Sequence, residues 1–289
     1  KVFLFGMLFL FAGLAFKISA FPFQVWAPDV YQGAPTPTTA FLAVGSKAAG
    51  FVLLIRLLVA AVPEVTAEWT SVLLVISALT ILYGNLCALP QRNLKRLLAY
   101  SGIANAGYLL MGIVAQSEEG TVAILYYLAG YLFTVMAAFM IINLLTKEGE
   151  GEDISCLAGL SKRSPFLAFA MTLAAVSLAG IPPLAGFFGK FLLVKSVATE
   201  AFGNTCFFVL LAVAVFGVVV SIYYYFGIVR TIFWGRRKAD EPTPPPVTIG
   251  LPVRIVLGCC VAAILYLGLL PNKPVKWAET AAKVEATRK

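Results

Sequence analysis

The chain has 289 residues, of which 60% are hydrophobic and only 12% are charged, and its mean hydropathy is +0.90. Soluble domains carry about 25% charged residues, so the composition excludes a soluble globular protein and predicts an all-α polytopic membrane protein. The net charge of +8 does not indicate nucleic-acid binding, because the basic residues lie in short loops between apolar segments, as in membrane proteins.

The titratable composition also limits the chemistry of this chain. It contains no histidine, and its five cysteines form no CxxC pair. Haem with a histidine ligand is therefore excluded, and no zinc or iron–sulfur site is predicted. If the protein takes part in redox chemistry, the electrons are expected to travel through other subunits.

In chain order, about eight apolar segments are long enough to cross a bilayer, which requires about 20 mostly apolar residues. They cover approximately 2–29, 38–61, 70–89, 96–115, 121–145, 165–198, 204–234 and 247–270. Pro22 interrupts the first segment, and Pro182 and Pro183 interrupt the sixth. Because proline removes a helical hydrogen bond and clashes with the preceding turn, each of these two segments is predicted to be a broken helix.

The charges of the connecting loops alternate along the chain. One set of loops is basic and includes Arg92, Lys95, Arg96, Lys147, Lys162, Arg163, Arg230, Arg236, Arg237 and Lys238. The other set has no Lys or Arg but contains Glu64, Glu68, Glu118, Glu119 and Glu200. By the positive-inside rule the basic loops face the cytoplasm. The basic tail after Pro271 falls on the other side, and the connections 147–164 and 239–247 are expected to be surface linkers.

The N-terminus has the charged start and apolar run of a signal peptide. Lys17 interrupts the end of that run, and further apolar segments follow it, which favours a membrane span. The sequence does not begin with Met, and the chain is expected to be the later portion of a longer protein.

Three lysines, Lys17, Lys47 and Lys190, lie where a loop is difficult to reach. A cation at the bilayer centre costs about 2.5–3.5 kcal/mol on insertion scales, so such residues are candidates for function. Two of them lie near the helix breaks, where proline leaves backbone carbonyls without their usual donors. These carbonyls belong to Ile18, Leu178 and Ala179. Broken helices beside charges at membrane depth are typical of ion pathways in transporters.

Other interpretations of these residues remain open. Each lysine could instead extend its ammonium to the membrane surface from near a helix end, or serve only as a structural contact. The run Tyr223–Tyr225 favours packing among helices or a position at the membrane interface over proton transfer.

Three stretches of sequence resemble one known family. They read FKISAFPFQVWAPDVYQGAPTPTTAFLAVGSKAAGF (16–51), QRNLKRLLAYSGIANAGYLLMG (91–112) and LAGLSKRSPFLAFAMTLAAVSLAGIPPLAGFFGKF (157–191). They are similar to the antiporter-like N subunits of respiratory complex I, the NADH:quinone oxidoreductase. The resemblance extends to about residue 235 and implies a fold of about fourteen helices with an inverted five-helix repeat.

Within that fold the resemblance assigns the eight segments to helices seven to fourteen. Residues 1–61 would be the last two helices of the first repeat, 62–238 the second repeat, and 239–289 a linker, the final helix and a tail. The proton-relay lysines of the family's seventh, eighth and twelfth helices match Lys17, Lys47 and Lys190. Lysine at position 190 is typical of the N subunit, whereas the sister M subunit has glutamate there.

The resemblance implies a proton-translocating subunit, in which protons cross through a hydrated chain of buried lysines driven by redox chemistry elsewhere. No cofactor is expected in this chain; NADH, flavin, iron–sulfur clusters and quinone are expected in partner subunits. The implied partners are other complex I membrane subunits, especially the M subunit and the small K subunit, in a bacterial inner membrane. A subunit of a cation/proton antiporter or of a membrane-bound hydrogenase is the alternative, and a passive membrane scaffold is a third.

Two positions depart from the family pattern. Gln24 and Asn105 stand where the family often has histidine. Neither side chain titrates, so a proton route here is expected to use water, lysine and hydroxyl groups.

Overall fold

The computed structural model describes residues 2–61, 63–147, 149, 151–201, 205–235, 247 and 249–287. The first half comprises α1 (Val2–Ile18), α2 (Trp26–Gly33), α3 (Thr36–Phe41), α4 (Lys47–Leu54), α5 (Pro63–Ala88), α6 (Leu94–Val114) and α7 (Glu118–Lys147). The second half comprises α8 (Leu160–Arg163), α9 (Pro165–Ala179), α10 (Ala185–Glu200), α11 (Thr205–Trp234), α12 (Leu251–Leu269) and α13 (Asn272–Thr287). The described residues form no β-strand beyond one isolated bridge, Asn93 with Asp153.

The predicted apolar segments are all found as helices. Among the described residues, six helices are long and apolar enough to cross a membrane, and Phe5–Ile18 and Pro165–Ala179 are shorter apolar helices. Both short helices precede the predicted proline breaks, and α2 and α10 continue the chain beyond them. The prediction of an all-α membrane protein with two broken helices is therefore confirmed.

The span Thr36–Leu58 contains two π-helical stretches that the sequence analysis missed. They cover Leu42–Ser46 and Ile55–Ala61, on either side of α4. A π-helical stretch rotates the following residues relative to a regular helix and often accompanies functional sites. The first stretch ends immediately before Lys47, so it sets the direction of that side chain.

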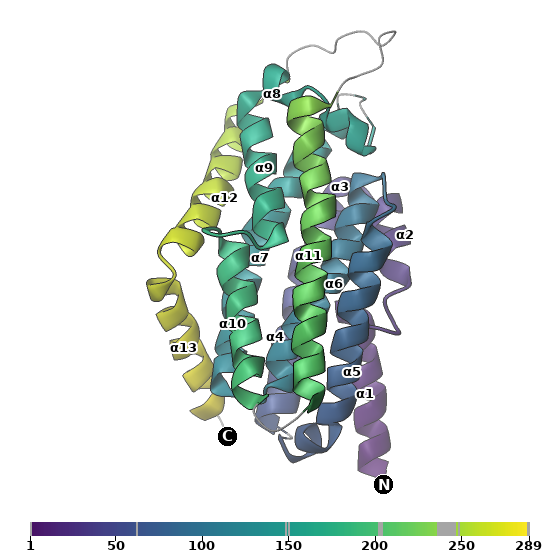
Figure 1. Ribbon diagram of the computed structural model, residues 1–289, viewed down its shortest axis with the longest axis vertical. Coiled ribbons are helices and arrows are strands. Elements are labelled where there is room, and N and C mark those ends of the chain that lie inside the picture. Colours follow the sequence, from purple (N-terminus) through teal and green to yellow (C-terminus); the bar gives the residue numbers. More distant parts are fainter. Residues whose placement is uncertain are drawn as a thin grey trace.

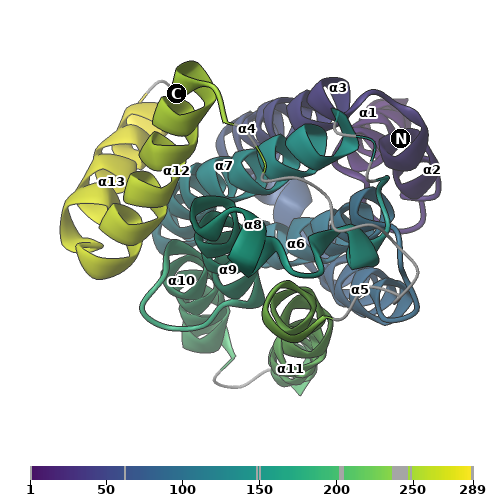
Figure 2. The same ribbon diagram turned by 90° about the horizontal axis from the view of Figure 1, so that it is seen from above.

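Helix α6 is the centre of the bundle, as seen from above in Figure 2. Its whole membrane-spanning window is buried, whereas only 28% of the corresponding windows of α11 and α12 is buried. A helix buried on all sides needs neighbours all round, and α5, α7, α2 and α10 pack against it. The long helices run roughly parallel in Figure 1, and α11 exposes large apolar side chains such as Val219 and Phe216, as expected of a surface in contact with lipid.

The described parts of the basic loops gather at one end of the bundle, here called the basic end (top of Figure 1). Ile154 N donates to the Arg92 carbonyl at 2.8 Å, which joins two of these loops. Lys95 is 3% exposed, and its Nζ lies 2.6 Å from Glu152 Oε1. Arg236, Arg237 and Lys238 lie outside the described residues, as does most of the 239–247 linker. The 147–164 connection contains α8 and a short 3₁₀ helix, Ile154–Leu157.

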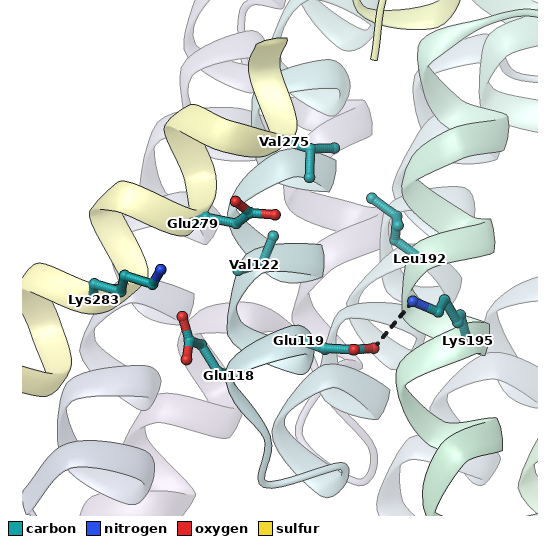
Figure 3. A pocket seen from close by; sticks show the side chains of 8 residues that line it. All are labelled: Glu118, Glu119, Val122, Leu192, Lys195, Val275, Glu279 and Lys283. Atoms are coloured by element: carbon teal, nitrogen blue, oxygen red, sulfur yellow. Dashed lines mark ion pairs between the residues drawn. The ribbon is translucent and has the colours of Figure 1, made fainter. Parts of the chain in front are cut away.

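The tail is helical, which the sequence analysis did not predict. Helix α13 lies at the opposite, acidic end and packs against α7. A mixed-charge pocket of about 240 Å³ is lined by residues of α13, α7 and α10 (Figure 3). It is lined by Glu118, Glu119, Val122, Leu192, Lys195, Val275, Glu279 and Lys283. Lys195 pairs with Glu119 at 3.4 Å, and both side chains are exposed at the surface of the chain.

The close packing of α5 against α6 depends on glycine. A Cβ on Gly107 would lie 2.8 Å from Ile81 N and 3.0 Å from the Ser77 carbonyl. At the same crossing Ser77 Oγ donates to the Gly107 carbonyl at 2.8 Å. Small residues that allow this approach are typical of helix packing in membranes.

We predict that Gly107→Ala destabilises the protein by about 1–3 kcal/mol, because overpacking at a backbone contact forces two helices apart. The measurement is the thermal unfolding midpoint of the purified protein in mild detergent. Gly258→Ala is the matched control, since a Cβ at Gly258 meets nothing within 4 Å. An equal midpoint for both variants would contradict the proposed packing role of Gly107.

Candidate functional site

The first helix break lies between α1 and α2. Helix α1 ends at Ile18, Ser19 adopts a φ of 61°, and the Phe21–Pro22 peptide bond is cis. The Phe16 carbonyl accepts hydrogen bonds from Ser19 N at 3.0 Å and from the Trp26 indole Nε1 at 2.9 Å. Phe21 N donates to Thr80 Oγ1 at 3.0 Å. Protein groups thus satisfy the broken backbone, as required within a membrane.

Lys17 does not occupy the position expected from the sequence. Its side chain is exposed on the surface of this chain, not buried, and its stem passes over Gly50, where a Cβ would lie 3.7 Å from Lys17 Cγ. No hydrogen bond or ion pair joins Lys17 to another of the described residues. The predicted contact between the Lys17 ammonium and the Ile18 carbonyl is therefore not formed.

The second break, between α9 and α10, is built around Lys190. Helix α9 ends at Ala179, Gly180 follows with a φ of 84°, and the Pro182–Pro183 peptide bond is cis. Lys190 is 4% exposed. Its Nζ donates to the Leu178 carbonyl at 2.8 Å and lies 3.5 Å from the Ala179 carbonyl. These are the two carbonyls from which Pro182 and Pro183 remove the usual helical donors, and the lysine donates to them instead.

The dipole of α9 adds to this contact. The C-terminal end of a helix carries a partial negative charge and favours a cation. The ammonium also lies 5.0 Å from the centre of the Tyr108 ring, within the range of a cation–π contact. Lys190 is therefore held inside the bundle by carbonyls and an aromatic face, with no carboxylate partner among the described residues.

Lys47 is also buried beside α6, next to Gly102. It is 3% exposed, and its Nζ lies 6.0 Å from the centre of the Tyr31 ring. A Cβ on Gly102 would lie 2.8 Å from Lys47 Nζ and 3.2 Å from the Tyr131 hydroxyl, so the ammonium and this hydroxyl lie beside the same stretch of α6. Within the described part of the chain, Lys47 Nζ has no hydrogen-bond partner.

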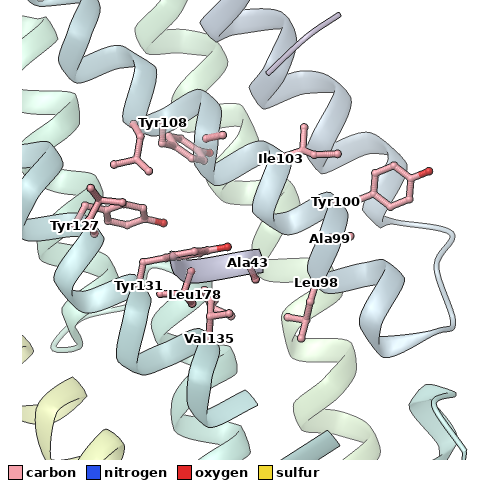
Figure 4. Packing of buried hydrophobic residues seen from close by; sticks show 14 of the residues in the cluster. Ala43, Leu98, Ala99, Tyr100, Ile103, Tyr108, Tyr127, Tyr131, Val135 and Leu178 are labelled. Atoms are coloured by element: carbon pink, nitrogen blue, oxygen red, sulfur yellow. The ribbon is translucent and has the colours of Figure 1, made fainter. Parts of the chain in front are cut away.

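Hydroxyl and amide groups lie between these two lysines. The Tyr127 hydroxyl donates to Asn105 Oδ1 at 2.8 Å, and Asn105 Nδ2 donates to Ser101 Oγ at 3.4 Å. Ser101 Oγ in turn shares a hydrogen bond with the Tyr225 hydroxyl. Figure 4 shows the rings of Tyr127 and Tyr131 one turn apart on α7; their centres are 6.1 Å apart. We call Ser101, Asn105, Tyr127, Tyr131 and Tyr225 the central cluster.

Most of the central cluster is not predicted by the sequence pattern. Asn105 stands out as a departure from the family pattern, but the run that contains Tyr225 favours packing or the membrane interface. One signal was available: Ser101, Asn105 and Tyr108 are spaced at i, i+4 and i+7, which places them on one face of a helix. Gln24, the other departure from the family pattern, is buried at 2% exposure on the α1–α2 connection, away from this face.

The chain is similar to known membrane proteins of one family. The sequence model of the family described as "NADH:quinone oxidoreductase/Mrp antiporter, TM" matches residues 1–221. The NADH-quinone oxidoreductase subunit N of Desulforamulus reducens is 42% identical over 279 residues, which cover 96% of this chain and 56% of that protein. The chain therefore spans about half the length of the curated relatives it matches.

Solved structures agree with this assignment. A chain of respiratory complex I from Thermus thermophilus with bound aureothin has 35% identity and a TM-score of 0.75, covering 91% of this chain and 56% of that one. A chain of an archaeal membrane-bound sulfane sulfur reductase has 26% identity and a TM-score of 0.81, covering 95% and 54%. On its sequence and on its fold, this chain belongs to the NADH:quinone oxidoreductase/Mrp antiporter transmembrane family.

Proposed function

We propose that this chain is part of a proton-translocating membrane subunit of a bacterial NADH:quinone oxidoreductase. The observation that carries the proposal is the burial of two lysines, Lys47 and Lys190, beside α6, together with the hydrogen-bonded hydroxyl and amide groups of the central cluster. Buried cations are costly in a membrane, and neither of these has a carboxylate partner among the described residues. A site that stores and releases a proton accounts for that cost better than a structural contact does.

The chemistry required of each lysine is reversible protonation. Burial in a medium of low dielectric disfavours a charged amine, whereas the Leu178 and Ala179 carbonyls favour the ammonium form of Lys190. A change in charge nearby is then able to shift the balance. Hydroxyls of the central cluster accept and donate hydrogen bonds, so they order water between the lysines without titrating themselves.

We propose that Lys17 faces further protein in the assembled complex. An ammonium directed into hydrocarbon would cost several kcal/mol. Lys17 is exposed on this chain and has no hydrogen-bond or ion-pair partner among the described residues. In that position Lys17 would form the first charge of the relay, ahead of Lys47 and Lys190. Pro22, Pro182 and Pro183 would then act by holding the two breaks open.

The electron-transfer chemistry would lie in partner subunits. In this proposal NADH, flavin, iron–sulfur clusters and quinone are bound elsewhere, and redox energy reaches this chain through contacts with the sister M subunit and the K subunit. The absence of histidine from the sequence supports that division of labour. The charge difference between the two ends of the bundle supports a bacterial inner membrane with the basic end in the cytoplasm.

A subunit of a cation/proton antiporter, or of a related hydrogenase-type complex, is the second candidate. It is favoured by a family that includes Mrp antiporters and by the likeness to a sulfane sulfur reductase chain. Purification in mild detergent distinguishes the two: the leading proposal expects flavin and iron–sulfur subunits to co-purify. Vesicles containing the antiporter alternative would exchange Na⁺ for H⁺ without any electron donor.

We predict that Lys190→Met lowers the number of protons pumped per NADH oxidised by the reconstituted complex. The substitution keeps a long side chain but removes the ionisable group and leaves the Leu178 and Ala179 carbonyls without their donor. Lys195→Met is the matched control, because Lys195 is on the same helix but at the surface. Equal pumping by the two variants, in complexes of equal subunit content, would remove Lys190 from the relay.

We predict that Lys17→Ala also lowers pumping while the complex still assembles, because the relay would lose its first charge. The measurement is proton uptake by proteoliposomes, with subunit content checked on the same sample. If pumping is unchanged and assembly is intact, Lys17 has no part in the relay. If assembly alone falls, the lysine is a structural contact with a partner.

A further inference from the structure

A groove opens at the basic end of the bundle, beside α11. Its volume is about 380 Å³. It is lined by Leu89, Gln91, Leu97, Ile154, Ile222, Tyr223, Tyr224, Phe226, Gly227 and Arg230. Most of these residues are apolar, and Tyr224 is the buried one among the polar residues of the lining: it is 5% exposed and has a polar partner inside the bundle.

That partner is Asn85 of α5, which is fully buried at 0% exposure. The Tyr224 hydroxyl donates to Asn85 Oδ1 at 3.1 Å, and Asn85 Nδ2 donates to the Ile81 carbonyl at 2.9 Å. A Cβ on Gly217 would lie 2.8 Å from Asn85 Nδ2 and 2.6 Å from the Tyr108 hydroxyl. Both polar groups therefore occupy the space beside Gly217.

Tyr108 connects these polar groups with Lys190, because the Lys190 Nζ lies 5.0 Å from the centre of the Tyr108 ring. A second contact comes from Ser221, which is 1% exposed. Its Oγ lies 3.5 Å from the Ala179 carbonyl, the oxygen that Lys190 Nζ also approaches at 3.5 Å. Gly217, Ser221 and Tyr224 are spaced at i, i+4 and i+7, so one face of α11 runs from the groove to the Lys190 site.

The groove also connects with the central cluster. The rings of Tyr224 and Tyr225 have centres 4.5 Å apart, and the Tyr225 hydroxyl bonds Ser101 Oγ. Polar groups thus extend from one surface groove toward both buried lysines. Polar contacts that only held α5 and α11 together would not need to extend from a surface groove to a buried ammonium.

We propose, on the basis of the proton-translocating function proposed above, that this groove and the polar face of α11 form an aqueous access route between Lys190 and the basic end. Tyr224, Asn85, Tyr108 and Ser221 are positioning residues that line the route and order its water. Gaps longer than a direct hydrogen bond are bridged by water, which requires two to four polar partners at each position. The lining supplies hydroxyls, an amide and carbonyls for that purpose.

The proton balance is simple. A hydronium at the groove gives a proton to the first ordered water, each water or hydroxyl passes one proton inward as it receives another, and the neutral Lys190 amine becomes an ammonium. No side chain other than Lys190 changes its charge. The reverse sequence returns the proton to the groove, and the charge of neighbouring groups in the complex sets the direction.

The first experiment removes one hydroxyl. Tyr224→Phe keeps the ring but loses the bond to Asn85, whereas Tyr223→Phe makes the same change at a neighbour in the same groove that is 73% exposed. In reconstituted complexes of equal subunit content, Tyr224→Phe is expected to pump fewer protons per NADH oxidised than Tyr223→Phe. Equal pumping by the two variants would overturn the route.

The second experiment closes the groove after the protein has folded. Gly227→Cys is expected to be tolerated because a Cβ there meets nothing within 4 Å. A charged, membrane-impermeant methanethiosulfonate applied from the basic side then adds a bulky group to the groove. Pumping is expected to fall on labelling and to recover with reductant, while the parent complex, with its exposed Cys206 and Cys259, is unaffected by the same reagent.

The outcomes separate the two proposals. Complete labelling of Gly227→Cys without loss of pumping, in a preparation in which Lys190→Met fails to pump, would overturn the access route and leave the proton function standing. Normal pumping by Lys190→Met would overturn the proton function itself. Loss of pumping by both labelled Gly227→Cys and Lys190→Met, together with normal pumping by Tyr223→Phe, supports the route.

Discussion

The contact between the Lys190 ammonium and the end of α9 is the constraint on which the second half of the structure depends. A buried ammonium is costly in a membrane, and so are backbone carbonyls that a helix break leaves without donors. Each satisfies the other here: Nζ lies 2.8 Å from the Leu178 carbonyl and 3.5 Å from that of Ala179. The lysine and the break therefore supply each other's hydrogen-bond partners at this depth.

The two breaks solve the same backbone problem differently, and this difference separates their lysines. At the first break, the Trp26 indole and the Thr80 hydroxyl satisfy the backbone, so no ammonium is required there and Lys17 is left at the surface. At the second break, the lysine itself is the donor. Lys17 is not needed as a donor to the backbone and is therefore available to a partner. Lys190 donates to the break and is therefore part of the fold of its own chain.

The sequence was sufficient to predict the spans, the two breaks and the carbonyls that Lys190 contacts, because apolar length and proline chemistry are local properties. It was insufficient for the exposure of Lys17. Helix α1 is apolar on every side, so its sequence does not indicate which face meets protein. Helix α13 was missed because its charged residues resemble those of a linker. Tyr224 and Tyr225 were assigned to packing because their partners, Asn85 and Ser101, lie more than 100 residues away along the chain.

Glycine positions explain how polar groups reach the core of so apolar a bundle. Lys47 Nζ lies 2.8 Å from the point where Gly102 would carry a Cβ, and Lys190 Cδ lies 3.0 Å from the corresponding point at Gly180. The Tyr108 hydroxyl and the Asn85 amide share the space beside Gly217. At each position the missing side chain leaves room for a polar group to pack directly against a helix backbone. The positions of these glycines therefore determine where polar groups enter the bundle, as much as the lysines and tyrosines themselves do. Even an alanine at one of these glycines would place its methyl group in the space that the polar group occupies.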